Sequence, residues 1–168
     1  MVRMALCVAF CCVTAYLSFP LPFTPGMVTA LTVALSVTAY VLPPKDTFYV
    51  VFAYLFLGLI GLPVYASGAS GAGKLFGPVG GFMLAWLAAY PLLSWLKGSK
   101  PLFKRYVAVN IVLVMPLTYL GGMISMSLCM DLTPWQALAM GSFPFIPGDI
   151  LKSILAAFIG VRLAKMKV

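Results

Sequence analysis

Residues 79–96 read VGGFMLAWLAAYPLLSWL, eighteen residues without a charged side chain. A helix of about 20 residues crosses the hydrocarbon core of a bilayer, so this run predicts a membrane-spanning helix. Hydropathy, together with the Pro and Gly residues that interrupt it, predicts five further spans. Their expected ranges are 4–19, 27–42, 48–61, 106–123 and 150–163.

The composition of the whole chain agrees with six spans. Of its 168 residues, 63% are hydrophobic and 8% are charged, whereas a soluble domain carries about 25% charged residues. A soluble fold of this size has too little interior for so many apolar side chains. We therefore expect an all-α integral membrane protein in which residues 1–168 form a single transmembrane domain, with no room for a second, soluble one.

The basic residues are distributed unevenly between the expected loops. The chain has 11 Lys and Arg against 3 Asp and Glu, a net charge of +8. In a soluble protein this excess would favour a nucleic-acid partner, but in a membrane protein it records orientation. We expect both termini in the cytoplasm and no nucleic-acid partner, because only Lys74 then lies in the outer loops and only Lys152 within a span. The other nine basic residues are then cytoplasmic: Arg3, Lys45, Lys97, Lys100, Lys104, Arg105, Arg162, Lys165 and Lys167.

The chain offers few groups for catalysis or for metal binding. It contains no His, which argues against the usual zinc sites, His-based triads and His proton relays. Its four Cys do not form the paired Cys-x-x-Cys pattern of a zinc ribbon. We therefore expect no enzyme activity, no metal and no cofactor. A small membrane enzyme is the alternative from another class, and it would need a base or a nucleophile.

One apolar stretch contains two opposite charges. Residues 143–158 read FPFIPGDILKSILAAF, in which Pro147 and Gly148 suit the entry to a helix and Asp149 falls in its first turn. Asp149 and Lys152 are three residues apart, so they share a helix face. Charges inside a membrane cost on the order of 2.5–3.5 kcal/mol each and usually face a cavity or a partner. The pair either grips a polar ligand or only neutralises itself.

Two further polar features lie outside this pair. Asn110, the single Asn of the chain, lies within the fifth expected span and either contacts the ligand or bonds a neighbouring helix. A short helix is expected between residues 131 and 145, after Asp-Leu-Thr-Pro, lying at the membrane interface.

Residues 61–81, GLPVYASGASGAGKLFGPVGG, contain seven of the fifteen Gly residues. Gly68, Gly73 and Lys74 imitate a phosphate-binding loop, but Leu75 replaces the hydroxyl residue that binds magnesium, so a nucleotide site is not expected. Glycine-rich backbone can line a cavity and approach a ligand closely, although the segment could also be a simple connector. Tyr65 and Phe76 are candidates for flat apolar walls.

Four blocks of the sequence carry a resemblance that covers nearly the whole chain. They are residues 22–24 (PFT), 61–66 (GLPVYA), 75–82 (LFGPVGGF) and 144–152 (PFIPGDILK). In these blocks the chain resembles the biotin transporter S-component family, BioY, the substrate-binding membrane subunits of energy-coupling factor (ECF) transporters. Val79 departs from the Thr that is common in the family after Gly-Pro.

The resemblance implies a six-helix protein in the plasma membrane of a prokaryotic-type cell that binds biotin near its outer face, under loops that act as a lid. Its implied partners are a transmembrane coupling subunit and two ATPase subunits. Ala5 and Ala9 match the Ala-x-x-x-Ala motif that contacts the coupling subunit. Alternatives are an S-component for another vitamin or a biotin facilitator without ATPases.

The resemblance also implies roles for the site residues. Asp149 and Lys152 match the ligand-binding Asp and Lys of the family. The glycine loop, residues 61–81 with Gly68, Ser70, Gly71 and Gly73, matches the substrate-covering loop. The chemistry of biotin agrees, because its ureido N–H groups fit Asp149, while its carboxylate fits either Lys152 or Lys74.

Overall fold

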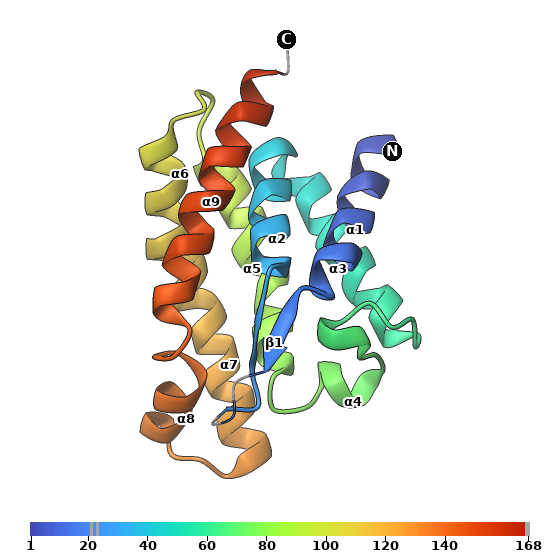
Figure 1. Ribbon diagram of the computed structural model, residues 1–168, viewed down its shortest axis with the longest axis vertical. Coiled ribbons are helices and arrows are strands. Elements are labelled where there is room, and N and C mark those ends of the chain that lie inside the picture. Colours follow the sequence, from blue (N-terminus) through green and yellow to red (C-terminus); the bar gives the residue numbers. More distant parts are fainter. Residues whose placement is uncertain (21, 23, 167–168) are drawn as a thin grey trace.

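The chain folds into a bundle of helices with one small hairpin (Figure 1), and the computed structural model describes residues 1–20, 22 and 24–166. Phe23, part of one block of the resemblance, and Lys167 lie outside the described residues. The longer helices are α1 (Val2–Ala15), α2 (Leu31–Val41), α3 (Pro44–Leu59), α5 (Gly80–Leu96), α7 (Met115–Met130) and α9 (Ile146–Lys165). The short elements are β1 (Ser18–Pro20), β2 (Met27–Thr29), η1 (Ala66–Gly68), α4 (Ala72–Leu75), α6 (Phe103–Val109), η2 (Asn110–Val114) and α8 (Pro134–Gly141).

Both termini lie at one end of the bundle (Figure 1). The opposite end carries α4, α8 and the tip of the hairpin in which β1 pairs antiparallel with β2. Asp149 lies near the start of α9 and therefore at this second end, while Arg162 and Lys165 lie in the last turn of the same helix. The bundle thus separates an end with the hairpin and short helices from an end with the termini.

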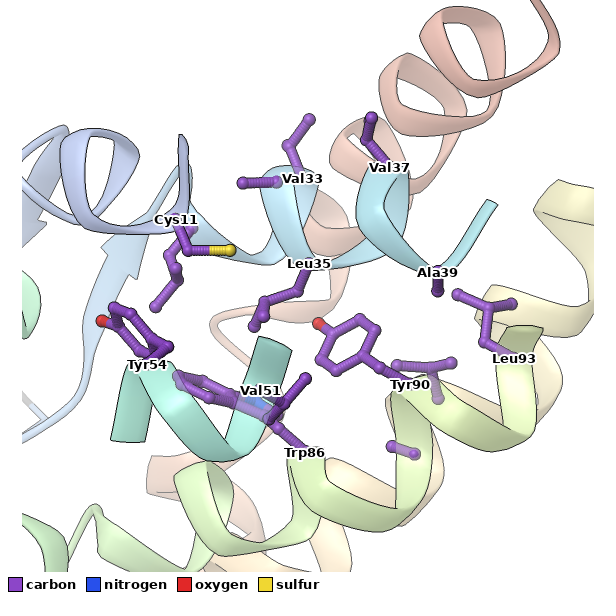
Figure 2. Close-up of a cluster of buried hydrophobic side chains, with 14 of the residues drawn as sticks. Cys11, Val33, Leu35, Val37, Ala39, Val51, Tyr54, Trp86, Tyr90 and Leu93 are labelled. Carbon is purple, nitrogen blue, oxygen red and sulfur yellow. The ribbon is translucent and has the colours of Figure 1, made fainter. Parts of the chain in front are cut away.

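Helix α2 lies at the centre of the bundle, with nine of its 11 residues buried. Its side chains meet those of α1, α3 and α5 in the core shown in Figure 2, where Leu35 lies between Tyr54 and Tyr90. Helix α9 packs on α2 where the ring of Tyr40 lies against Gly160. The same ring stacks on Tyr106 with centroids 4.2 Å apart. A helix that is apolar on all sides requires such cover on all sides.

Helices α5 and α7 cross at glycines. A Cβ added to Gly81 would lie 2.0 Å from the carbonyl oxygen of Gly121, and one added to Gly121 would lie 2.4 Å from that of Gly81. Ser125 on α7 also accepts a hydrogen bond from the Gly81 N–H (3.1 Å) and donates one to Pro78 (2.7 Å). Small residues at a crossing let two backbones touch, which is how helices associate where apolar burial gives no driving force.

The helix boundaries differ from those expected at several ends; α3 and α9, for example, each begin four residues earlier than expected, at Pro44 and Ile146. Residues 18, 19 and 27–29, assigned to the first two spans, form the hairpin together with Pro20 instead, because Pro20 and Pro25 lack the backbone N–H that continues a helix and the paired strands satisfy the backbone groups. The expected end at residue 123 was too early, since the helix runs to Met130 with Gly121 and Gly122 packed against α5.

Two other expectations agree with the structure. Helix α5, Gly80–Leu96, confirms the helix expected at residues 79–96. The short helix expected between residues 131 and 145 is α8, and Thr133 caps it in a reciprocal arrangement with Gln136. Asp131 does not form that cap, because it ends α7 in the left-handed conformation.

By length and composition alone, the described chain has one continuous helix that could cross a membrane, Phe103–Met130, with 28 residues. The pair α8 and α9, bent by 52°, passes the same test when taken together. Helices α1, α2 and α5 are apolar but shorter than 18 residues. The long helix exposes a stripe of large apolar side chains at four-residue spacing, from Leu120 through Ile124 to Leu128, which the core helix of a soluble protein would bury.

Candidate ligand-binding site

A cavity opens at the hairpin end of the bundle. The space between its walls is about 900 Å³ including the open solvent at its mouth. Most of the wall is apolar or aromatic, and six side chains supply charge or a phenol. The lining includes Thr24, Gly26, Met27, Thr29, Leu31, Thr32, Tyr54, Tyr65, Lys74, Phe82, Met83, Trp86, Thr118, Tyr119, Met126, Phe145, Asp149 and Lys152.

The predicted pair forms the polar part of this wall. The ammonium of Lys152 lies 2.8 Å from Oδ1 of Asp149, and 17–18% of each side chain is exposed. Pro147 starts the helix without needing a backbone N–H. The carboxylate in the first turn then faces the positive end of the helix dipole. Asp149 and Lys152 therefore do neutralise each other, and they do so in the wall of the cavity.

Tyr119 completes the polar wall and was not among the residues predicted from the sequence. Its hydroxyl donates a hydrogen bond to Oδ2 of Asp149 at 2.7 Å. The carboxylate therefore accepts one bond from its own helix and one from α7. An aromatic residue in an apolar span gives no sign of such a role, because most of these side chains are core or lipid-facing.

The π-helical turn η2 helps to direct Tyr119 to the cavity. Nine residues of regular α-helix turn through about 900°, so Asn110 and Tyr119 would lie on opposite faces of one helix. A π turn holds one residue more than an α turn and shifts the following residues by about 100°. With η2 between them, Asn110 faces α2 through a hydrogen bond to Ser36 while Tyr119 reaches α9.

The glycine loop contributes two of its predicted residues to the cavity wall, Tyr65 and Lys74. Gly68, Ser70, Gly71 and Gly73 lie in the same loop but do not line the cavity. Phe76 also lies outside the lining and is 65% exposed. The loop needs its glycines for backbone geometry, with a positive φ at Gly68 (75°) and Gly71 (89°).

Two tyrosines fasten this loop to α3 by exchanging hydrogen bonds. Tyr54 on α3 donates to the carbonyl of Val64 in the loop (2.9 Å), and Tyr65 in the loop donates to that of Leu55 on α3 (2.6 Å). The ring of Tyr65 fits only because position 58 is Gly, where a Cβ would lie 2.0 Å from the ring. Burial raises the pKa of the Tyr65 phenol, which keeps its proton available as a donor.

Asn110 lies away from the large cavity. Its side chain is buried and donates to Ser36 (2.9 Å) and to the Tyr40 hydroxyl (3.2 Å), so it joins the fifth expected span to α2. It borders a second, smaller and more polar cavity that Asp149 and Lys152 also line. The structure therefore shows the bond to a neighbouring helix, and contact between Asn110 and a ligand in the large cavity would need a path past the charged pair.

Ala5 and Ala9 lie on an exposed face of α1. Leu6 and Phe10, about 100° and 140° around the helix from Ala5, are also exposed, while Cys11, Thr14 and Ala15 face the core. Packing within the chain therefore does not cover this face, and a partner could contact it. No cluster of three or more His, Cys, Asp or Glu side chains that could hold a metal occurs among the described residues.

The hairpin supplies wall residues that sequence reasoning did not single out. Thr24 and Gly26 lie at its tip, and Gly26 packs against the ring of Phe145 from the start of α9. Thr24 belongs to one block of the resemblance and Phe145, Asp149 and Lys152 belong to another, and the fold brings these residues to the same cavity. The site as a whole is a largely apolar pocket with a carboxylate, three phenols and two ammonium groups, suited to an amphipathic small molecule with N–H donors.

Comparison with known proteins places this chain in a family. The sequence matches the model of the BioY family over residues 1–167. Biotin transporter BioY2 of Lactococcus lactis subsp. cremoris (strain MG1363) is 34% identical over 163 residues, which cover 96% of this chain and 87% of the relative. Biotin transporter BioY of Thermotoga maritima is 31% identical over 168 residues, which cover 100% of this chain and 97% of the relative.

A solved structure of an S-component has the same fold as this chain. The crystal structure of the S-component for biotin from an ECF-type ABC transporter matches this chain with a TM-score of 0.89 and 28% sequence identity. The match covers 98% of this chain and 89% of that one. Sequence and fold therefore agree over almost the full length, and the chain belongs to the BioY family, a family of transport proteins and not of enzymes.

Proposed function

We propose that this chain is the biotin-binding S-component of an ECF-type importer. It binds biotin in the cavity at the hairpin end, on the outer side of the membrane, and delivers it inward together with a transmembrane coupling subunit and two ATPases. The observation that carries the proposal is the Asp149–Lys152 pair, at 2.8 Å, in the wall of an otherwise largely apolar cavity. The biotin-transporter names of the relatives and of the matched structure support the choice of ligand.

The cavity and biotin have complementary chemistry. The ureido ring of biotin carries N–H donors, which need an acceptor such as the Asp149 carboxylate. Its apolar bicycle and alkyl chain suit aromatic walls such as Trp86 and Phe82. Its carboxylate needs a cation, and the wall offers Lys74 in addition to the paired Lys152.

The membrane position of the bundle is part of the same proposal. Six spans with both termini in the cytoplasm put the hairpin, α4 and α8 outside. The exposed apolar stripe on the long helix supports a position in lipid, and the excess of basic residues toward the end that carries the termini supports this orientation. We place the protein in the plasma membrane as one transmembrane domain, with α8 at the interface.

The proposal is tested by binding of biotin to purified protein and to the Asp149→Asn variant. We expect the wild type to bind biotin and the variant to lose most of its affinity, at least about 30-fold, because it removes a charged acceptor and leaves Lys152 unpaired. Binding is measured by calorimetry and by the thermal shift on adding biotin.

The chain contains its own controls for that experiment. Asp46→Asn and Asp131→Asn change the other two carboxylates, which do not line the cavity, and both should bind biotin within about twofold of wild type. If wild-type protein does not bind biotin but binds another vitamin, the choice of ligand is refuted. Full affinity in Asp149→Asn would refute the assigned site.

A further inference from the structure

The two oxygens of the Asp149 carboxylate are held by different parts of the molecule. Lys152, on the same helix, binds Oδ1 at 2.8 Å, and Tyr119, on α7, binds Oδ2 at 2.7 Å. Each oxygen has one partner among the described residues, and each retains acceptor capacity. A carboxylate fixed at both oxygens cannot rotate freely, so its remaining lone pairs keep one direction.

Lys152 alone would not fix that direction. It is joined to Asp149 by a flexible four-carbon side chain on the same helix, and an ammonium is a point charge that accepts many approach angles. Tyr119 is more restrictive, because its ring has two torsions and its hydroxyl is at the end of a rigid group. It also comes from another helix, so the bond ties the charged pair of α9 to α7.

We propose that Tyr119 is a positioning residue, which orients the Asp149 carboxylate so that its unused lone pairs receive the N–H donors of the ligand. This inference rests on the proposed function of the cavity. It assigns to Tyr119 a role exerted through Asp149 and gives the π turn η2, which directs Tyr119 toward α9, a share in ligand specificity.

The first measurement needs no ligand. The chain has only three side-chain carboxylates, so the infrared carboxylate bands of the purified protein are few. The Asp149 band is identified as the one missing in Asp149→Asn. We expect Tyr119→Phe to shift this band, because the phenylalanine ring fills the same space without donating a hydrogen bond.

The second measurement is biotin affinity. Tyr119→Phe should bind biotin about tenfold more weakly, as expected when a bond to a charged group is lost. The matched control is Tyr40→Phe, which removes another buried hydroxyl, bonded to the carbonyl of Tyr106 at 2.9 Å and remote from the large cavity. The control should bind biotin within about twofold of wild type.

The outcomes separate the two proposals. A shifted band together with tenfold weaker binding supports positioning. Weaker binding with an unmoved Asp149 band would mean that Tyr119 acts on the ligand itself, and a shifted band with unchanged affinity would mean that the orientation is irrelevant; either result overturns the inference. A wild type that does not bind biotin overturns the proposed function, while the infrared result still decides whether Tyr119 holds Asp149.

Discussion

Lys74 and Lys152 differ in whether a carboxylate of the protein already pairs with their ammonium group. Lys152 is paired with Asp149 at 2.8 Å, whereas Lys74 forms no salt bridge among the described residues. Both line the cavity. A ligand carboxylate could therefore pair with Lys74, in the glycine loop, without displacing another carboxylate. To pair with Lys152 it would have to compete with Asp149.

This difference predicts the effect of Lys74→Met. The variant should bind biotin about five- to tenfold more weakly, because it removes the cation that would form a partly exposed ion pair with the ligand carboxylate. It should bind biotin methyl ester, which has no carboxylate, as well as wild type does. Calorimetric titration with both ligands gives the comparison. Lys45→Met, in the first turn of α3 at the other end of the bundle, is the control. Equal losses for both ligands would show that Lys74 does not meet the carboxylate.

At the scale of elements, the glycine loop and α3 depend on each other through position 58. Gly58→Ala would place a methyl group 2.0 Å from the Tyr65 ring. That ring would have to leave α3 and give up its bond to Leu55. We expect a loosened loop and dissociation of biotin about tenfold faster, measured by chasing bound labelled biotin with unlabelled ligand.

A substitution on the exposed face of the same helix provides the comparison. Phe56 is about half exposed, and Phe56→Ala should leave the dissociation rate within about twofold of wild type. If Gly58→Ala also released biotin at the wild-type rate, the loop would not hold the ligand in place.

The elements show which parts of the fold the sequence could predict. Residues 79–96 could be assigned to a helix because a long apolar run has few other solutions, and α5 confirms it. The hairpin could not, because strands of only three residues, one of them ending in Pro20, have no periodicity to detect. The π turn likewise has no sequence signature here, and without it the helix phase of Tyr119 is wrong.

The candidate site was predictable to the extent that charge is rare in this chain. Asp149 and Lys152 stand out in an apolar stretch, and the structure places both at the cavity. Tyr119, Trp86 and Phe82 look like any other aromatic residue of a span. Their place in the wall depends on helix rotation and packing, which a single sequence does not encode visibly.

At the scale of the whole molecule, biotin binding and biotin uptake should depend on different faces of the protein. Ala5 and Ala9 lie on the exposed side of α1, away from the cavity lining. If this is where the coupling subunit docks, Ala5→Trp should leave biotin affinity within about twofold and reduce biotin uptake by cells to less than about a tenth, because a large ring prevents close helix approach.

The control for that experiment lies on the same helix. Phe10 is exposed and lies about 140° around α1 from Ala5, so Phe10→Trp should retain uptake. Undiminished uptake in Ala5→Trp would rule out this face as the docking surface. Loss of both binding and uptake would mean that the substitution damages the bundle itself.

The unequal lengths of the helices have a mechanical consequence for the surrounding lipid. Helix α1, with 14 residues, is about 21 Å long, and the continuous helix Phe103–Met130, with 28 residues, is about 42 Å long, while the hydrocarbon core of a bilayer is about 30 Å thick. If both helices span the membrane, as we propose, the bilayer thins beside α1 or flanking side chains snorkel there, and the long helix tilts or projects on its own flank. A bundle with such uneven edges strains the bilayer asymmetrically, so membrane thickness becomes one of the conditions that set the protein's resting tilt.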